Sequence, residues 1–196
     1  MGMPAMQIDW TADMVRALPS DGNRYEVVDG ELLVSPTPAL RHQFAVVQLW
    51  LLLQVWLDQH PVGVAGVAPY DFEFSTHRMV EPDVYVVPLG PQPAPRREEY
   101  KLPLLLGVEV LSPGTARNDR KIKRPLYQSE AVPECWIVDL DAEVVERWRP
   151  DDTRPEILFD RLEWSPSAEY TAFAMDLPAF FQKVQRQVAA LGLSRK

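Results

Sequence analysis

This sequence has a single cysteine and fewer basic than acidic residues, and each shortage limits the kinds of site or partner that the protein can have. One cysteine, Cys135, occurs among 196 residues, which excludes an internal disulfide and a zinc site built from several thiolates. Such cysteine usage fits a reducing cytoplasm. Lys and Arg number 20 against 28 Asp and Glu, for a formal charge of -8, so a nucleic-acid partner would need a local basic patch.

Long uninterrupted apolar stretches are also missing. The longest, residues 44–57, is broken by Gln48 and Gln54 and is shorter than the roughly 20 residues of a membrane-spanning helix. The N-terminus has no basic leader followed by an apolar stretch, so we expect no signal peptide. We therefore expect a cytoplasmic protein without a membrane segment.

The sequence does contain enough apolar material for one core. Hydrophobic residues make up 46% and charged residues 24%, as in folded soluble chains and unlike disordered ones. A chain of 196 residues is typical of one domain, so we expect residues 1–196 to fold as a unit.

Turn signals and hydrophobic patterns predict the order of the elements. Asp29-Gly30 separates two β-rich runs, residues 25–28 and 31–34, and predicts an N-terminal hairpin because both turn positions favour positive φ. The later elements are a buried helix over 39–59, strand-like runs over 63–75 and 82–88, a strand over 104–111, a helix over 116–128, a hairpin of 135–140 with 143–150, and a helix over 177–191. This order predicts an α/β or α+β fold, with a mixed sheet flanked by helices.

Two carboxylates lie in apolar, strand-like surroundings. Asp83 opens the strand after Pro82, and Glu109 lies between Val108 and Val110. A buried unpaired carboxylate costs several kcal/mol, so each should have a cation, hydrogen bonds or a metal beside it. Mg²⁺ takes oxygen ligands and often only one or two carboxylates. Alternatively, Asp83 caps a strand and Glu109 pairs with a cation on a half-exposed face, and these two residues alone favour that structural role.

A third motif favours a catalytic site. Asp119, Lys123 and Tyr127 recur every four residues, which places them on one face of a helix. They could form a solvated stripe with one ordinary ion pair. Because this helix follows the strand of Glu109 closely, Lys123 could instead reach the carboxylate, orient a water and stabilise charge developing on phosphorus. Further basic residues of the helix suit a phosphodiester backbone: Arg117, Arg120, Lys121 and Arg124.

These residues belong to a series of motifs that resembles a known family. The segments "RYEVVDGELLVSP", "LRHQ", "EPDVYVV", "GVEVLSPGTARNDRKIKRPLY" and "AVPECWIVDLDAEVVERWRP" resemble the successive signatures of the Uma family of restriction endonucleases, which have the PD-(D/E)xK nuclease fold. The resemblance covers residues 23–150 and implies a nuclease-like core there, with 151–196 as an extension packing on it. It also implies a restriction-endonuclease-like fold with a mixed four-stranded core and helices on both sides.

The resemblance assigns roles by position. Asp83 matches the acid of the "PD" motif and Glu109 the acid of the "(D/E)xK" strand, and both would bind the metal. Leu111 stands where the lysine is usual. Lys123 matches a lysine supplied by the following helix, with Asp119 and Tyr127 as its companions.

Two more residues match motif positions. Glu26 matches an acid of the hairpin signature and could be a third metal ligand or a solvent-facing residue of an edge hairpin. His42 matches a histidine near the start of the long helix. A lone histidine there is more often a cap or a hydrogen-bonded structural group than a ligand, although it could contact phosphate.

The resemblance implies an endonuclease that uses Mg²⁺ or Mn²⁺ to hydrolyse DNA, and two other hypotheses remain. The charge of -8, the missing lysine at Leu111 and the apolar long helix suggest a catalytically silent binding or assembly module, in which that helix forms a homodimer surface. A glycosidase would need two spaced acids, but the basic helix and the lack of an evident sugar-stacking surface count against it.

Overall fold

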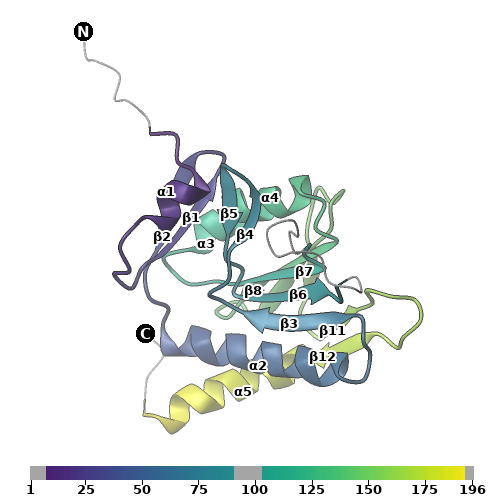
Figure 1. Ribbon diagram of the computed structural model, residues 1–196. Coiled ribbons are helices and arrows are strands. Elements are labelled where there is room, and N and C mark those ends of the chain that lie inside the picture. The colour runs from purple at the N-terminus through teal and green to yellow at the C-terminus, as the bar shows by residue number, and fades with distance from the viewer. Residues whose placement is uncertain (1–7, 91–102, 193–196) are drawn as a thin grey trace.

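A six-stranded mixed sheet lies at the centre of the computed structural model, which describes residues 8–90 and 103–192 (Figure 1). Two of its neighbouring strands run parallel and the other pairs are antiparallel. The strand order is β10 (Glu156–Leu158), β9 (Val144–Trp148), β8 (Glu134–Asp139), β7 (Leu106–Val110), β6 (Val84–Pro88) and β3 (Gly63–Val67). The parallel pair is β7 and β8.

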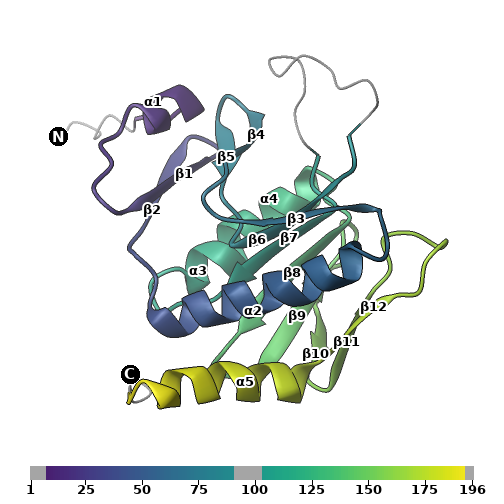
Figure 2. The ribbon, with the colours of Figure 1, turned by 60° about the horizontal axis from the view of Figure 1, so that its bottom comes forward.

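Helices cover both faces of this sheet. On one face, α2 (Leu40–Leu57) and α5 (Leu177–Ala190) lie side by side (Figure 2) and share a core cluster with Val108 and Trp136. The opposite face packs against Leu126 and Tyr127. Because side chains alternate along a strand, Val108 faces α2 and Glu109 faces Tyr127. Every residue of β7 is buried, as expected for a strand covered on both sides.

The helix predicted over residues 116–128 consists of three segments. These are α3 (Ala116–Asn118), the π-helix η2 (Asp119–Lys123) and α4 (Arg124–Ser129). Pro125 lies at the start of α4 and has no N–H to donate back along the helix, so regular α-helical bonding is interrupted there. Short π-helical segments are frequent at functional sites, and η2 holds two buried charged residues, Asp119 and Lys123.

A second sheet, of four antiparallel strands, contains the predicted hairpin. Its order is β2 (Glu31–Ser35), β1 (Arg24–Val28), β5 (Arg78–Val80) and β4 (Phe72–Ser75). The hairpin is confirmed: Asp29 has φ 50° and Gly30 has φ 80°. Before it, Thr11 caps α1 (Ala12–Arg16) by accepting a hydrogen bond from the N–H of Met14.

The predicted fold class is confirmed, although the details differ. The central sheet has six strands instead of four because β3 and β10 add one strand at each edge. A third sheet pairs β11 (Arg161–Trp164) with β12 (Phe173–Asp176), and Leu162 and Phe173 enter the same core cluster as α2 and α5. Among the described residues, no helix is both long and apolar enough to cross a membrane. The cytoplasmic location stays a prediction.

Candidate active site

Six buried ionisable side chains predicted from the sequence come together beside the end of β7. Each is at most 6% exposed: Glu26, His42, Asp83, Glu109, Asp119 and Lys123. They come from the hairpin, the start of α2, the residue before β6, β7 itself and η2. Glu26 and Glu109 therefore do not face solvent, and Asp119 and Lys123 are not a solvated stripe.

Lys123 lies at the centre of this cluster. Its ammonium nitrogen is 2.8 Å from Oε1 of Glu26 and 2.7 Å from Oε1 of Glu109. Burial disfavours the charged ammonium, but the nearby carboxylates, Glu109 first, outweigh burial and raise the pKa of Lys123. The lysine therefore remains protonated at neutral pH.

Glu109 is the most strongly perturbed carboxylate of the cluster. The phenol of Tyr127 donates a hydrogen bond to its Oε1 at 2.5 Å, the same oxygen that faces Lys123. Burial raises the pKa of Glu109 well above its ordinary value, and Asp119, Asp83 and Glu26 add to this effect while Lys123 opposes it. Glu109 therefore holds its proton more tightly than an exposed glutamate does.

Asp83 is held in its ionised form. Its Oδ1 accepts a hydrogen bond from Arg24 at 2.9 Å, and its Oδ2 accepts one from the backbone N–H of Val110 at 2.8 Å. The Nε2 atom of His42 lies 3.1 Å from Oδ2. Burial would raise the pKa of Asp83, but His42, Arg24 and Lys123 together lower it far below the ordinary value. The bond to Val110 also fixes Asp83 next to Glu109.

Arg24 and Glu81 also belong to the cluster, although the sequence motifs did not identify them. Arg24 lies 3.9 Å from a carboxylate oxygen of Glu81, and the backbone N–H of Glu81 donates to Glu26 at 2.7 Å. Burial raises the pKa of Glu81 to about 7, against the effect of Arg24. Alternate residues of a strand share a face, so the position of Arg24 two residues before Glu26 on β1 could have indicated that both side chains point into the site.

The four basic residues expected to bind phosphate do not converge on the cluster. Arg117 and Lys121 are exposed. Arg120 forms ion pairs with Asp139 and Glu146 at 2.8 Å and 2.6 Å, and the guanidinium of Arg124 lies over the ring of Trp148. Their contact with DNA stays a prediction.

A small cavity opens among the clustered side chains. It is lined by Glu26, Asp83, Glu109, Asp119, Arg24, Lys123 and His42, together with Ser35, Ser112, Thr115 and two prolines. Its volume is about 20 Å³. Because one water needs about 10–15 Å³ of such space, the cavity has room for one water or one ion.

The donor atoms of the cavity suit a hard divalent cation. Four carboxylates line the cavity beside two permanent cations, Arg24 and Lys123. Within residues 8–90 and 103–192, no group of three or more His, Cys, Asp or Glu side chains is placed to hold a metal ion. Mg²⁺ is commonly bound by one or two carboxylates with water and phosphate completing its shell, so Asp83 and Glu109 could hold it.

The buried carboxylate of Asp119 predicts a pH dependence of stability. Burial raises the pKa of Asp119 from 3.8 to about 6, against the effect of Lys123. The folded chain then holds this proton more tightly than the unfolded chain, so stability falls as pH rises from about 4 to about 6. We expect Asp119→Asn to be more stable than the parent by up to about 3 kcal/mol at pH 8, and nearly equal below pH 4.

Urea denaturation of both proteins across this pH range, in EDTA, measures the difference. Asp151→Asn, at an exposed position, serves as the control and should show no such trend. A constant difference between Asp119→Asn and the parent at all pH values would contradict the assignment.

Comparisons with known proteins agree with this architecture. The family model Uma2, described as "Putative restriction endonuclease", matches residues 12–177, a range that includes every residue of the cluster. A crystal structure described as "a putative nuclease belonging to DUF820", from Anabaena variabilis ATCC 29413, is similar with a TM-score of 0.71 and 18% sequence identity. The similarity covers 89% of this chain and 98% of that chain, and it shows a common fold. No curated protein matches the chain.

Proposed function

We infer that this chain, which belongs to the Uma2 family, is an endonuclease that hydrolyses DNA phosphodiester bonds with Mg²⁺ or Mn²⁺. The position of Lys123 carries the proposal. Leu111 occupies the strand position where the nuclease motif has its lysine, yet the ammonium of Lys123 lies 2.7 Å from Glu109 in the cavity that Asp83 also lines. A lysine and two acids therefore meet at one point.

Lys123 has the charge and the donors to stabilise a phosphoryl group. A divalent cation held by Asp83 and Glu109 would supply Lewis-acid polarisation and lower the pKa of the attacking water. An ammonium has three N–H donors. Contacts to Glu26 and Glu109 account for two, and a long contact of 3.4 Å to the carbonyl of Glu81 accounts for the third. An oxygen of the phosphate could replace that long contact and be stabilised as its negative charge grows.

Arg24 and His42 act as positioning residues for Asp83. Together with the N–H of Val110 they contact both carboxylate oxygens, so the side chain has little freedom to rotate. They also keep Asp83 ionised, which a carboxylate ligand must be.

The two other hypotheses derived from the sequence have less support. The absence of lysine at position 111 motivated a catalytically silent module, but Lys123 reaches Glu109 from η2. A carboxylate-pair glycosidase requires no lysine between its acids, whereas Lys123 is paired here with two carboxylates. Arg117 and Lys121 are exposed on α3 and η2, the helical segments next to and including Asp119 and Lys123, and could contact DNA phosphates away from the cavity.

We also propose a homodimer that uses α2. Val47, Leu51 and Val55 recur every four residues on this helix and are 55%, 44% and 53% exposed. A two-fold axis would bring two such stripes together. Sedimentation equilibrium of the parent and of Leu51→Glu measures this directly, and a monomeric parent would contradict the dimer.

Plasmid DNA incubated with the purified protein tests the function. We expect nicked or linear products with Mn²⁺ or Mg²⁺ and none with EDTA, because the proposed chemistry needs the cation. Intact plasmid under all metal conditions, with single-stranded DNA also uncut, would contradict the proposal. Cleavage that persists in EDTA would contradict its metal dependence.

A further inference from the structure

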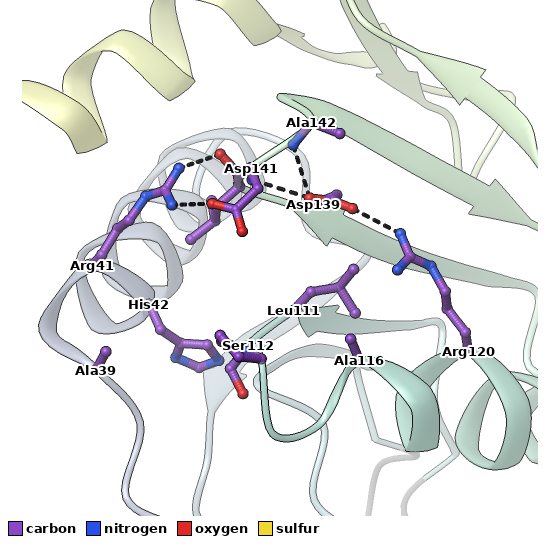
Figure 3. A pocket seen from close by; sticks show the side chains of 12 residues that line it. Ala39, Arg41, His42, Leu111, Ser112, Ala116, Arg120, Asp139, Asp141 and Ala142 are labelled. Atoms are coloured by element: carbon purple, nitrogen blue, oxygen red, sulfur yellow. Dashed lines mark hydrogen bonds and ion pairs between the residues drawn. The ribbon is translucent and has the colours of Figure 1, made fainter. Parts of the chain in front are cut away.

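Figure 3 shows a second pocket. It adjoins the small cavity among the clustered side chains, which is named here the catalytic cavity. The second pocket lies between the start of α2, the segment that follows β7, and the turn between β8 and β9, and it has a volume of about 360 Å³. His42 and Ser112 line both this pocket and the catalytic cavity. A group bound in the pocket would therefore lie next to a phosphate placed at the catalytic cavity.

The walls of the pocket combine apolar surface with paired charges. The apolar lining consists of Ala39, Leu111, Pro113, Ala116, Leu140 and Ala142. Across the rim, Arg41 donates to the carbonyl of Leu140 and forms an ion pair with Asp141 (Figure 3). On the other side, Arg120 donates to Asp139 at 2.8 Å. Two arginines and two aspartates give the rim no net charge, while they offer both donors and acceptors.

This chemistry suits a nucleobase better than a phosphate. A phosphate site needs an excess of positive charge, which the two ion pairs remove. A nucleobase has flat apolar faces and an edge that carries donors and acceptors, and it matches apolar walls with a mixed polar rim. His42 lines both cavities, and its Nδ1 is buried without a hydrogen-bond partner in the described part of the chain. Volumes of roughly 300 Å³ and above are typical of small-ligand pockets.

We propose that this pocket, named here the base pocket, receives one unpaired base next to the phosphate that is cleaved. The inference rests on the proposed nuclease function and specifies its substrate class. A base paired within a duplex cannot enter a pocket in the protein without leaving its stack. The preferred substrate is therefore single-stranded DNA or duplex DNA that contains an unpaired base.

Binding of abasic oligonucleotides tests the base pocket without any cleavage. Fluorescence anisotropy in EDTA measures the affinity for a short single strand and for versions in which each base in turn is removed. We expect one abasic position to weaken binding by the parent about tenfold, the size typical for loss of one bound base. Ala142→Phe, which fills the pocket from an exposed turn, should bind the intact strand about tenfold more weakly and be insensitive to that abasic position.

Two further variants keep the test decisive. Ala39→Phe fills the pocket from another side and should behave like Ala142→Phe, whereas Ala168→Phe, in an exposed turn outside the pocket, should behave like the parent. Three results would overturn the base pocket. They are binding that no abasic position weakens, equal sensitivity of Ala142→Phe and the parent to the abasic position, and no binding of single strands at all. Plasmid cleavage is scored separately, so a protein that cuts DNA without an abasic effect refutes the pocket and not the nuclease.

Discussion

Glu109→Gln is expected to lower the rate of Mn²⁺-dependent DNA cleavage by about a hundredfold or more while leaving the fold intact. Loss of a metal-binding carboxylate removes several kcal/mol of transition-state stabilisation, and about 1.4 kcal/mol corresponds to tenfold in rate. The amide oxygen of glutamine can still accept hydrogen bonds from Lys123 and Tyr127, which both meet Oε1 of Glu109. The contacts therefore survive, and only the charge is removed.

The stability of this variant separates a catalytic from a structural role. Because burial and neighbouring acids raise the pKa of Glu109, removing its charge should leave the free energy of unfolding unchanged or increase it. Cleavage kinetics and urea denaturation on the same preparations measure both quantities. Glu31→Gln, at an exposed position of β2, is the matched control and should cut like the parent. Parent-like cleavage by Glu109→Gln would contradict the assigned role.

Lys123→Met is expected to destabilise the protein by about 3–5 kcal/mol, the range for breaking a buried ion pair on one side. Lys123 is 1% exposed, and its loss leaves Glu26 and Glu109 buried without their ammonium partner. The decrease in the free energy of unfolding should be smaller at lower pH, because protonated Glu109 no longer needs a cation.

Urea denaturation at neutral and acidic pH measures this effect. Lys121→Met alters an exposed residue of the same helical segment, so its effect should stay within about 0.5 kcal/mol. Adding Glu109→Gln to Lys123→Met should restore part of the stability. Equal stability of Lys123→Met and the parent would show that the buried charges are not balanced by this lysine.

The longer elements of the fold could be predicted from sequence, whereas some three-residue strands could not. Asp29 and Gly30 both adopt the positive φ that a tight hairpin turn requires, and β7 is buried along its whole length. The sequence patterns of the hairpin and of this strand are therefore unambiguous. β5 and β10 contain three residues each, and β10 is largely exposed. Strands of that length depend on partners distant in the sequence and leave no clear period.

Apolar surroundings identified two of the acids in the sequence, and helical spacing identified Asp119 and Lys123. Glu109 is a charge within a buried strand, and Asp119 and Lys123 share a helix face beside it. The partners of Arg120 and Arg124 could not be predicted in the same way. Asp139, Glu146 and Trp148 contact these arginines only because the β8–β9 hairpin packs beside η2 and α4, and sequence indicates the sign of a charge but not what lies opposite it.

The central claim is that a buried lysine and a set of carboxylates form a divalent-cation site for phosphodiester hydrolysis. Anomalous diffraction from crystals soaked in Mn²⁺ tests it most directly. We predict one strong anomalous peak per chain within ligand distance, about 2.0–2.6 Å, of carboxylate oxygens of Asp83 and Glu109, with Lys123 still beside Glu109. A well-ordered site without a peak at saturating Mn²⁺, or a peak only at surface carboxylates, would contradict the claim.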